Sequence, residues 1–244
     1  MLASPILNAS PRVVSRSPIR ASPFPSQKEA GKVLARMLNY YSQKDDTIVL
    51  SIKPAATPLA YEVAKELKLP LDLFLVRTLK IDSMTVGAVT DRTEKPLYKD
   101  QIIKGYGFTQ KQLDDVIKQE RANLENQKSQ CCPPNYPLPR SENATVLLAT
   151  DGIQTGQNAR AAITLLKSIG FKGRIVLIAG VIGSDSQKIF TRDVDEVVAI
   201  RSPKVVGSVA SWYENQVEPT NEQIKLLLQK VDDEFNEKSE ELMR

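Results

Sequence analysis

The chain has no histidine, and it has only two cysteines and one tryptophan among its 244 residues. Histidine is the commonest general base and the commonest zinc ligand in proteins, so its absence excludes both uses here. Any acid–base chemistry must therefore rely on carboxylates, lysine or tyrosine. The two cysteines, Cys131 and Cys132, are adjacent, whereas disulfide frameworks and metal sites need cysteines that are spaced apart. We expect two free thiols in a reducing compartment.

Long apolar runs are also missing. No stretch approaches the roughly 20 apolar residues that a helix needs to span a bilayer, so we expect a soluble protein with no membrane partner. Residues 1–26 are rich in serine, proline and arginine and contain no acid. This composition is typical of a disordered tail or of an organelle transit peptide. The first alternative predicts a cytoplasmic protein, and the second predicts a plastid or mitochondrial one.

The excess of positive charge lies in that N-terminal segment. The formal net charge is +4, and residues 1–28 contain four basic residues, Arg12, Arg16, Arg20 and Lys28. The rest of the chain has 29 basic and 29 acidic residues. A neutral body gives no support for a nucleic-acid-binding face, so we expect no nucleic-acid partner.

Hydrophobic periodicity predicts an α/β fold with an open, mainly parallel sheet flanked by helices. Strands are predicted at 47–52, 71–77, 85–90, 145–150, 174–181 and 196–200. Helices are predicted to begin after Ser26, Thr57, Asn158, Thr109 and Thr220, with a short one near 185–191. The unit 47–77 reads as strand, helix, strand, and such a crossover implies parallel strands.

The domain organisation follows from the same pattern. Residues 78–108 have the least regular pattern apart from the strand at 85–90, so we expect a small helical or irregular insertion there. The body is assigned to residues 27–230 as one domain, because 244 residues suit a single α/β domain with appendages. Residues 231–244 are assigned to a C-terminal helical extension.

The run VLLATDGIQTGQN, residues 146–158, is the most informative stretch of the chain. A buried strand enters a loop with two glycines, and a helix follows. The backbone N–H groups of residues 155–158 have no intrahelical acceptor and meet the positive end of the helix dipole, so the loop suits a phosphate. The hydroxyl of Thr155 adds a donor, and Asp151 suits a ribose hydroxyl or a metal-bound water. The alternative is a plain strand-to-helix turn in which Asp151 is a capping or solvated residue.

This stretch resembles the phosphoribosyl pyrophosphate (PRPP) signature of type I phosphoribosyltransferases, in which an apolar strand runs into two acids and a loop ending in Thr-Gly. The chain also resembles a bacterial family of phosphoribosyltransferase-domain proteins over most of residues 27–230. Three further segments carry this resemblance: PLAYEVAKELKLPLDLFLVR at 58–77, VIKQERANLENQ at 116–127 and WYEN at 212–215. The resemblance implies a type I phosphoribosyltransferase-like fold with a Rossmann-like core and a small hood.

The resemblance also implies a ligand and a set of site residues. The ligand is a phosphoribosyl small molecule, PRPP or a nucleoside monophosphate, with Mg²⁺ accompanying PRPP if the protein is active. Asp151 is assigned to the ribose or the metal, and Lys53 to the pyrophosphate side. The other expected substrate-binding residues are Gly152, Ile153, Gln154, Thr155, Gly156, Gln157, Asn158, Ala55, Ala56, Arg77, Trp212 and Tyr213. No set of residues is predicted to coordinate a metal directly.

Several of these assignments have a structural alternative. Trp212 and Tyr213 either stack on a base or pack against the edge of the sheet. Arg77 either reaches a phosphate or forms an exposed ion pair. The segment that contains Lys53 either holds pyrophosphate or is simply a helix N-terminus.

Three departures from the family pattern concern residues that would hold the ligand. Thr150 stands where the first acid is expected. Lys-Pro-Ala-Ala at 53–56 stands where related proteins usually have Pro-Arg-Gly-Gly, and Glu-Asn-Gln at 214–216 stands near an expected Asp-Phe. Pro54 has no N–H to donate, and a lysine lacks the bidentate fork of an arginine.

These departures predict a phosphoribosyl-binding protein with weak or no transferase activity. One alternative is an active, Mg²⁺-dependent transferase that exchanges the pyrophosphate of PRPP for a nitrogenous base. The other is a noncatalytic regulatory or partner-binding subunit on the same fold. A homodimer or an unidentified protein partner is compatible with each.

Overall fold

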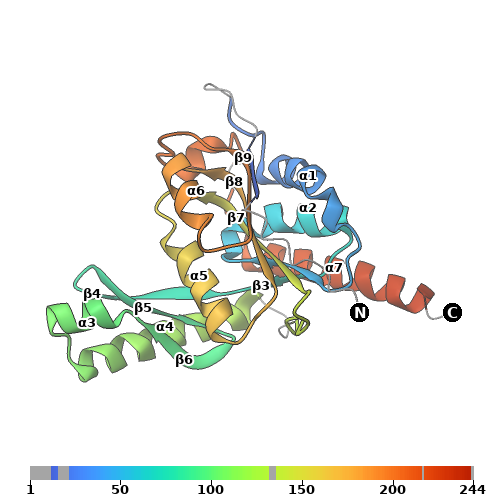
Figure 1. Ribbon diagram of the computed structural model, residues 1–244. Helices are drawn as coiled ribbons and strands as arrows, with labels where there is room; N and C mark the ends of the chain where they lie inside the picture. Colours follow the sequence, from blue (N-terminus) through green and yellow to red (C-terminus); the bar gives the residue numbers. More distant parts are fainter. Residues whose placement is uncertain (1–11, 16–21, 132–135, 216, 243–244) are drawn as a thin grey trace, which may run out of the picture.

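The computed structural model describes residues 12–15, 22–131, 136–215 and 217–242. Its main sheet has six strands in the order β1-β9-β8-β7-β2-β3, and every neighbouring pair is parallel (Figure 1). These strands are β1 (Arg12–Ser15), β2 (Thr47–Ser51), β3 (Leu71–Leu73), β7 (Thr145–Ile153), β8 (Arg174–Ile182) and β9 (Glu196–Arg201). The predicted open parallel sheet is confirmed.

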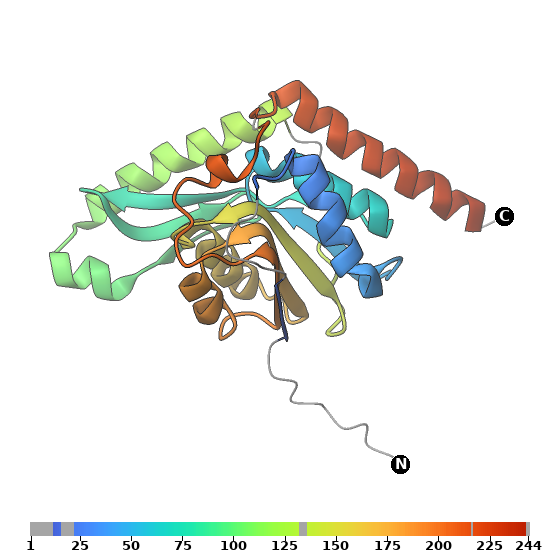
Figure 2. The ribbon, with the colours of Figure 1, turned by 90° about the horizontal axis from the view of Figure 1, so that it is seen from above.

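Helices cover both faces of this sheet (Figures 1 and 2). One face is covered by α1 (Gln27–Met37), α2 (Thr57–Leu67) and α7 (Asn221–Leu242), and the other by α5 (Gln157–Ser168) and α6 (Ser184–Phe190). Successive side chains of a strand point to opposite faces. Val49 and Leu147 accordingly pack in the first layer, whereas Ile48 and Val146 pack in the second. Every residue of β2 is buried, as expected for a strand covered on both sides.

The predicted caps of α1, α4 (Gln110–Cys131) and α7 are present, whereas α2 begins at Thr57 itself, which makes no capping hydrogen bond. The Ser26 hydroxyl accepts the N–H of Glu29 at 3.2 Å before α1. Thr109 and Gln112 cap each other's backbone N–H groups at the start of α4. Thr220 and Gln223 do the same at the start of α7. None of the helices in the described part of the chain is long and apolar enough to cross a membrane.

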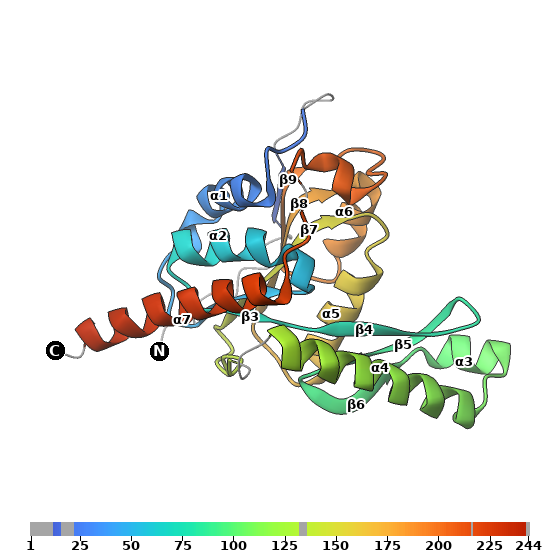
Figure 3. The same ribbon diagram turned by 180° about the vertical axis from the view of Figure 1, so that it is seen from behind.

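A second unit, which we call the hood, follows β3 and comprises residues 76–131. It has a three-stranded antiparallel sheet and two helices: β4 (Val76–Ile81), β5 (Met84–Thr90), β6 (Thr93–Tyr98), α3 (Asp100–Tyr106) and α4. Figure 3 shows α4 lying along this sheet and meeting α7 near the start of that helix. The expectation of an irregular insertion is therefore wrong for the strands β4 and β6.

The strand predicted at 71–77 is also wrong in its extent. The chain leaves the main sheet after Leu73 and enters the hood at Val76. Phe74 and Leu75 between them are buried, so the apolar pattern continues through the bend and conceals it.

A buried ion pair joins the hood to the main sheet. Arg92, between β5 and β6, donates to the Asp72 carboxylate of β3 at 2.5 Å, to the Leu73 carbonyl at 2.9 Å and to the Tyr136 carbonyl at 2.7 Å. The backbone N–H of Tyr136 donates to the same carboxylate at 2.6 Å. The hood is thus fixed at its inner end to the strand that precedes it.

The described part of the N-terminal segment is not a disordered tail. β1 pairs with the edge strand β9. Phe24 is 5% exposed, its ring lies 5.4 Å from that of Tyr213, and its N–H donates to the Trp212 carbonyl. The boundary expected at residue 26 is therefore wrong for residues 12–15 and 22–26, whereas residues 1–11 and 16–21 lie outside the described residues. One buried aromatic and a few backbone hydrogen bonds suffice for this, and bulk composition reveals neither.

The C-terminal boundary also needs correction, because α7 runs without interruption through residue 230. Val231 is 3% exposed and belongs to the same core as α2. An apolar face that continues along one helix gives no break at which an extension would begin. Three short 3-10 turns complete the fold: η1 (Asn39–Tyr41), η2 (Pro54–Ala56) and η3 (Val209–Trp212).

Candidate ligand site

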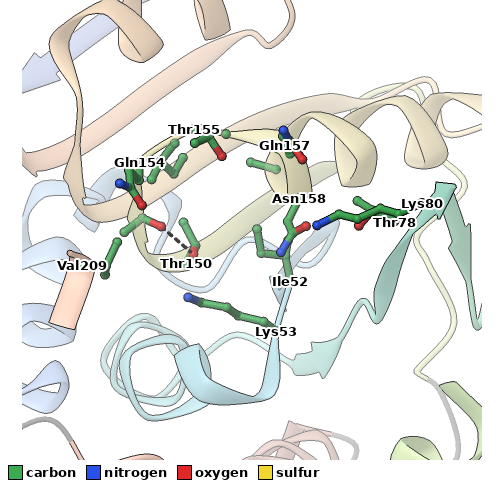
Figure 4. Close-up of a pocket in the computed structure, with 14 residues that line it drawn as sticks. Ile52, Lys53, Thr78, Lys80, Thr150, Gln154, Thr155, Gln157, Asn158 and Val209 are labelled. Carbon is green, nitrogen blue, oxygen red and sulfur yellow. Dashed lines mark hydrogen bonds between the residues drawn. The ribbon is translucent and has the colours of Figure 1, made fainter. Parts of the chain in front are cut away.

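A pocket of about 320 Å³ lies where β2, β4 and β7 meet the start of α5 (Figure 4). All seven predicted loop residues, Gly152 to Asn158, line this pocket, and Lys53 lines it with them. The structure therefore brings together residues from two loops that are far apart in the sequence. We call this cavity the loop pocket.

The turn at the loop pocket is shorter than the sequence suggests. β7 continues through Ile153, so only residues 154–156 connect it to α5. Gly156 has φ +73°, and a Cβ atom there would lie 2.7 Å from Cζ of Phe190. Both observations require glycine at this position. The backbone of the turn is thus fixed immediately before the helix.

Because α5 begins at Gln157, the first N–H groups of the helix have no intrahelical acceptor. Gln157, Asn158 and Ala159 all line the loop pocket. The exposed Thr155 lies beside them and adds a hydroxyl. This arrangement of donors at the positive end of a helix dipole suits an anion.

Asp151 lies beneath the pocket and is 1% exposed. Its Oδ1 atom lies 2.6 Å from the Lys53 ammonium and accepts from the Gly152 N–H at 2.8 Å and from the Thr150 hydroxyl at 3.2 Å. Its Oδ2 atom is buried and has no hydrogen-bond partner among the described residues. Asp151 is therefore a buried, partly satisfied charge that Lys53 neutralises, rather than a side chain exposed to ligand.

Arg77 does not line the loop pocket, but it lines an adjoining pocket of about 340 Å³. Lys53, Lys80 and Asn158 line both pockets. The Nε atom of Arg77 is buried without a hydrogen-bond partner in the part of the chain that is described. Ala55 and Ala56 lie in η2, next to Lys53, and line neither pocket.

Neither Trp212 nor Tyr213 lines these pockets. Tyr213 is 4% exposed, packs on Phe24 and donates its hydroxyl to the Asp151 carbonyl at 2.5 Å. Burial raises the pKa of Tyr213. Trp212 donates its indole N–H to the Val206 carbonyl at 2.7 Å. The base-stacking assignment is wrong for Tyr213, because a buried ring has no face left for a ligand. Tyr213 is instead a packing residue, as the structural alternative predicts.

The sequence did not point to several residues that line the loop pocket. They are Ile52, Thr78, Lys80, Ala159 and Val209, together with Thr150, which was noticed only as a departure. Figure 4 shows the Lys80 side chain directed toward Asn158, and the Lys53 side chain below Thr150. Thr78 and Lys80 belong to β4, which the sequence pattern did not identify as a strand. A prediction of β4 is what would have placed these two residues beside the loop pocket.

Comparisons with known proteins agree with this architecture. No family model matches the sequence. Two Mycobacterium tuberculosis proteins, from strains CDC 1551 and H37Rv, carry the name "Putative phosphoribosyl transferase", and each is 26% identical to this chain over 217 residues. The match covers 88% of this chain and 48% of each relative. The chain thus spans about half the length of the curated relatives it matches.

One solved structure is similar over its whole length. The crystal structure of TT1426 from Thermus thermophilus has 23% sequence identity and a TM-score of 0.71, with 85% of this chain and 98% of that chain covered. This similarity shows a common fold. Together with the names of the curated relatives, this common fold supports the resemblance of the chain to the type I phosphoribosyltransferase family.

Proposed function

We propose that the loop pocket binds a phosphorylated ribose, either PRPP or a nucleoside monophosphate. The 5′-phosphate would lie on the loop Gly152–Asn158. The observation that carries this proposal is that the free N–H groups of the α5 start and the Thr155 hydroxyl line one cavity. Lys53 and Lys80 line it as well, and none of its lining residues is acidic. A dianionic phosphate fits this charge distribution.

Mg²⁺ would accompany PRPP in an active protein of this family, but the residues here fit a directly bound ion poorly. Thr150 replaces the first acid, and one oxygen of Asp151 is already 2.6 Å from the Lys53 ammonium. Within the described ranges, no group of three or more His, Cys, Asp or Glu side chains is placed to hold a metal ion. We propose that any Mg²⁺ would be held through the phosphates of the ligand.

We further propose that transferase activity is weak or absent. Lys53 is paired with Asp151, and Pro54 has no N–H to offer pyrophosphate. A hydrogen bond to a charged group contributes about 1.5–3 kcal/mol, and each 1.4 kcal/mol lost from the transition state lowers the rate about tenfold. The losses multiply if several contacts are missing.

Calorimetric titration with ribose 5-phosphate, AMP and PRPP tests the binding proposal. Gly156→Ala places a Cβ atom 2.7 Å from Phe190, whereas Gly170→Ala meets nothing within 4 Å. Both glycines have positive φ, +73° and +92°, so the second variant controls for backbone strain. We expect Gly156→Ala to lower affinity about tenfold or more and Gly170→Ala to leave it unchanged, with both folded by circular dichroism.

Unchanged affinity for all three ligands in Gly156→Ala would overturn the binding proposal. The activity proposal needs a separate measurement, the release of pyrophosphate from PRPP with a panel of nitrogenous bases. Sustained turnover by the unaltered protein would refute weak activity and restore the active transferase. Binding without turnover would support the noncatalytic function.

A further inference from the structure

A second cavity of about 420 Å³ lies between α5 and the hood sheet, and we call it the hood pocket. α5 lies against β4 and β5 (Figure 1). Three residues, Thr78, Thr155 and Gln157, line both the hood pocket and the loop pocket. The two cavities are therefore neighbours that share part of the phosphate-binding loop.

Two cations and several hydroxyl groups line the hood pocket. Lys99 and Arg160 line it with Thr85 and Thr164, and none of its lining residues is acidic. Neither cation has an ion-pair partner among the described side chains. Two unpaired cations beside an anion-binding loop favour a second anionic group of the same ligand.

Arg160 is close to the phosphate loop as well as to the hood pocket. Its guanidinium lies 5.9 Å from the centre of the Phe190 ring. The same ring fills the space beside Gly156, where it would meet a Cβ atom at 2.7 Å. Arg160 and Gly156 therefore both lie beside the Phe190 ring, one helical turn apart along the chain.

Apolar residues also line the hood pocket. They include Gly87, Ala88 and Leu97, and Ala88 and Leu97 lie opposite each other on β5 and β6. An apolar surface suits an organic group, such as a sugar or a heterocycle. A free second phosphate would leave these residues without a contact.

We propose that the protein binds a ribose 5′-diphosphate ester more tightly than the corresponding 5′-monophosphate. The first phosphate lies on the loop Gly152–Asn158, the second lies between Lys99 and Arg160, and the attached organic group lies against Ala88 and Leu97. This inference rests on the proposed function, because the first phosphate must be held by the loop.

Calorimetric titration with AMP, ADP and ADP-ribose separates the three parts of the ligand. The gain from AMP to ADP measures the second phosphate, and the gain from ADP to ADP-ribose measures the organic group. We expect ADP-ribose to bind at least about tenfold more tightly than AMP, as charge-assisted contacts to a second phosphate imply. Titrations in EDTA keep metal ions out of the comparison.

Variants of the hood pocket locate the gain. Arg160→Ala and Lys99→Ala should each remove most of the difference between ADP-ribose and AMP while changing AMP affinity at most about twofold. Arg192→Ala and Lys95→Ala are matched controls that delete the same charges outside the lining residues. Both controls should preserve the difference.

Three outcomes would count against the inference. If AMP binds and neither diphosphate binds more tightly, the hood pocket takes no second phosphate, and the proposed function stands without it. If the gain survives both Arg160→Ala and Lys99→Ala, the second phosphate lies elsewhere and the inference is overturned. If no ligand binds at all, the proposed function fails, and the inference fails with it.

Discussion

Replacing Lys53 by methionine tests whether its ion pair with Asp151 stabilises the folded protein at the loop pocket. The substitution keeps most of the apolar stem and removes the ammonium that lies 2.6 Å from Oδ1. Asp151 is 1% exposed, so its carboxylate would be left buried with only the Gly152 N–H and the Thr150 hydroxyl as partners. Breaking a fully buried pair costs about 3–5 kcal/mol. The Lys53 side chain is 33% exposed and water screens part of the attraction, so we expect a loss of about 2 kcal/mol.

Asp151→Asn supplies the second arm of a double-mutant cycle. Asparagine retains an acceptor for the Gly152 N–H and carries no charge. The double variant should therefore lose less stability than the two single losses combined, with a coupling of about 1–2 kcal/mol. Urea unfolding at pH 7 measures each variant, and a loss of about 2 kcal/mol corresponds to a Tm lower by about 4–8 °C in a chain of this size. If Lys53→Met stays within about 0.5 kcal/mol of the unaltered protein, the reasoning is refuted.

Three further predictions concern other parts of the structure. Phe24→Ala removes a side chain that is 5% exposed, and such truncations cost about 3–5 kcal/mol of stability. A thermal melt should therefore show a Tm lower by roughly 6–20 °C. An unchanged Tm would mean that the N-terminal segment containing Phe24 contributes nothing to the fold. Burial, assisted by Glu196, raises the pKa of Tyr41 from 10.0 to about 12, so the neutral phenol stabilises the fold below pH 10 and this contribution is lost as pH rises through 12. Tyr41→Phe should therefore lose less stability between pH 10 and 12 in urea unfolding, and an identical loss would contradict this. Thr150→Asp places a second carboxylate beside that of Asp151, so the Tm of this variant should be low without metal and should rise with Mg²⁺ in scanning fluorimetry. The Tm of Thr150→Asn should not respond to Mg²⁺. A Tm of Thr150→Asp that does not change with Mg²⁺ would count against the assignment of position 150 to the first acid of the family motif.

The core could be predicted because its sequence signals are local and agree with one another. β2, β7 and β8 each contain an uninterrupted apolar run, as is typical of strands buried on both faces. The helices α1, α4 and α7 begin at side-chain caps that can be read over four residues. These signals do not depend on where the chain goes next.

The hood could not be predicted in the same way, because its position depends on a bend with no distinct pattern. Phe74 and Leu75 remain buried where the chain passes from one sheet to the other. β4 is only partly buried, so it lacks the apolar run of a core strand. The contribution of Thr78 and Lys80 to the loop pocket was lost with it.

Local sequence patterns predict some residues of the candidate site, whereas others depend on contacts between distant segments. The loop 152–158 was predicted because backbone donors at a helix start follow from the strand, glycine and helix pattern alone. The role of Tyr213 was not, since an aromatic residue in the sequence gives no sign of whether its partner is a ligand or Phe24. The pairing of Lys53 with Asp151 could not be predicted for the same reason. Lys53 follows β2 and Asp151 lies in β7, and these two strands become neighbours only when the sheet forms.

That pairing relates two of the departures from the family pattern, Thr150 and Lys53, to each other. Two acids at the end of β7 would require a divalent cation to balance them. Here Thr150 is neutral, Asp151 carries one negative charge, and Lys53 supplies one positive charge at 2.6 Å, so the buried group is balanced without a metal. A buried carboxylate without a cation costs several kcal/mol, and the lysine at 53 therefore compensates for the position of this acid. An arginine introduced at position 54 to contact pyrophosphate would have to leave the Lys53–Asp151 pair intact to preserve that balance. We therefore expect a substitution at Lys53 or at Asp151 to disturb the charge balance at both positions.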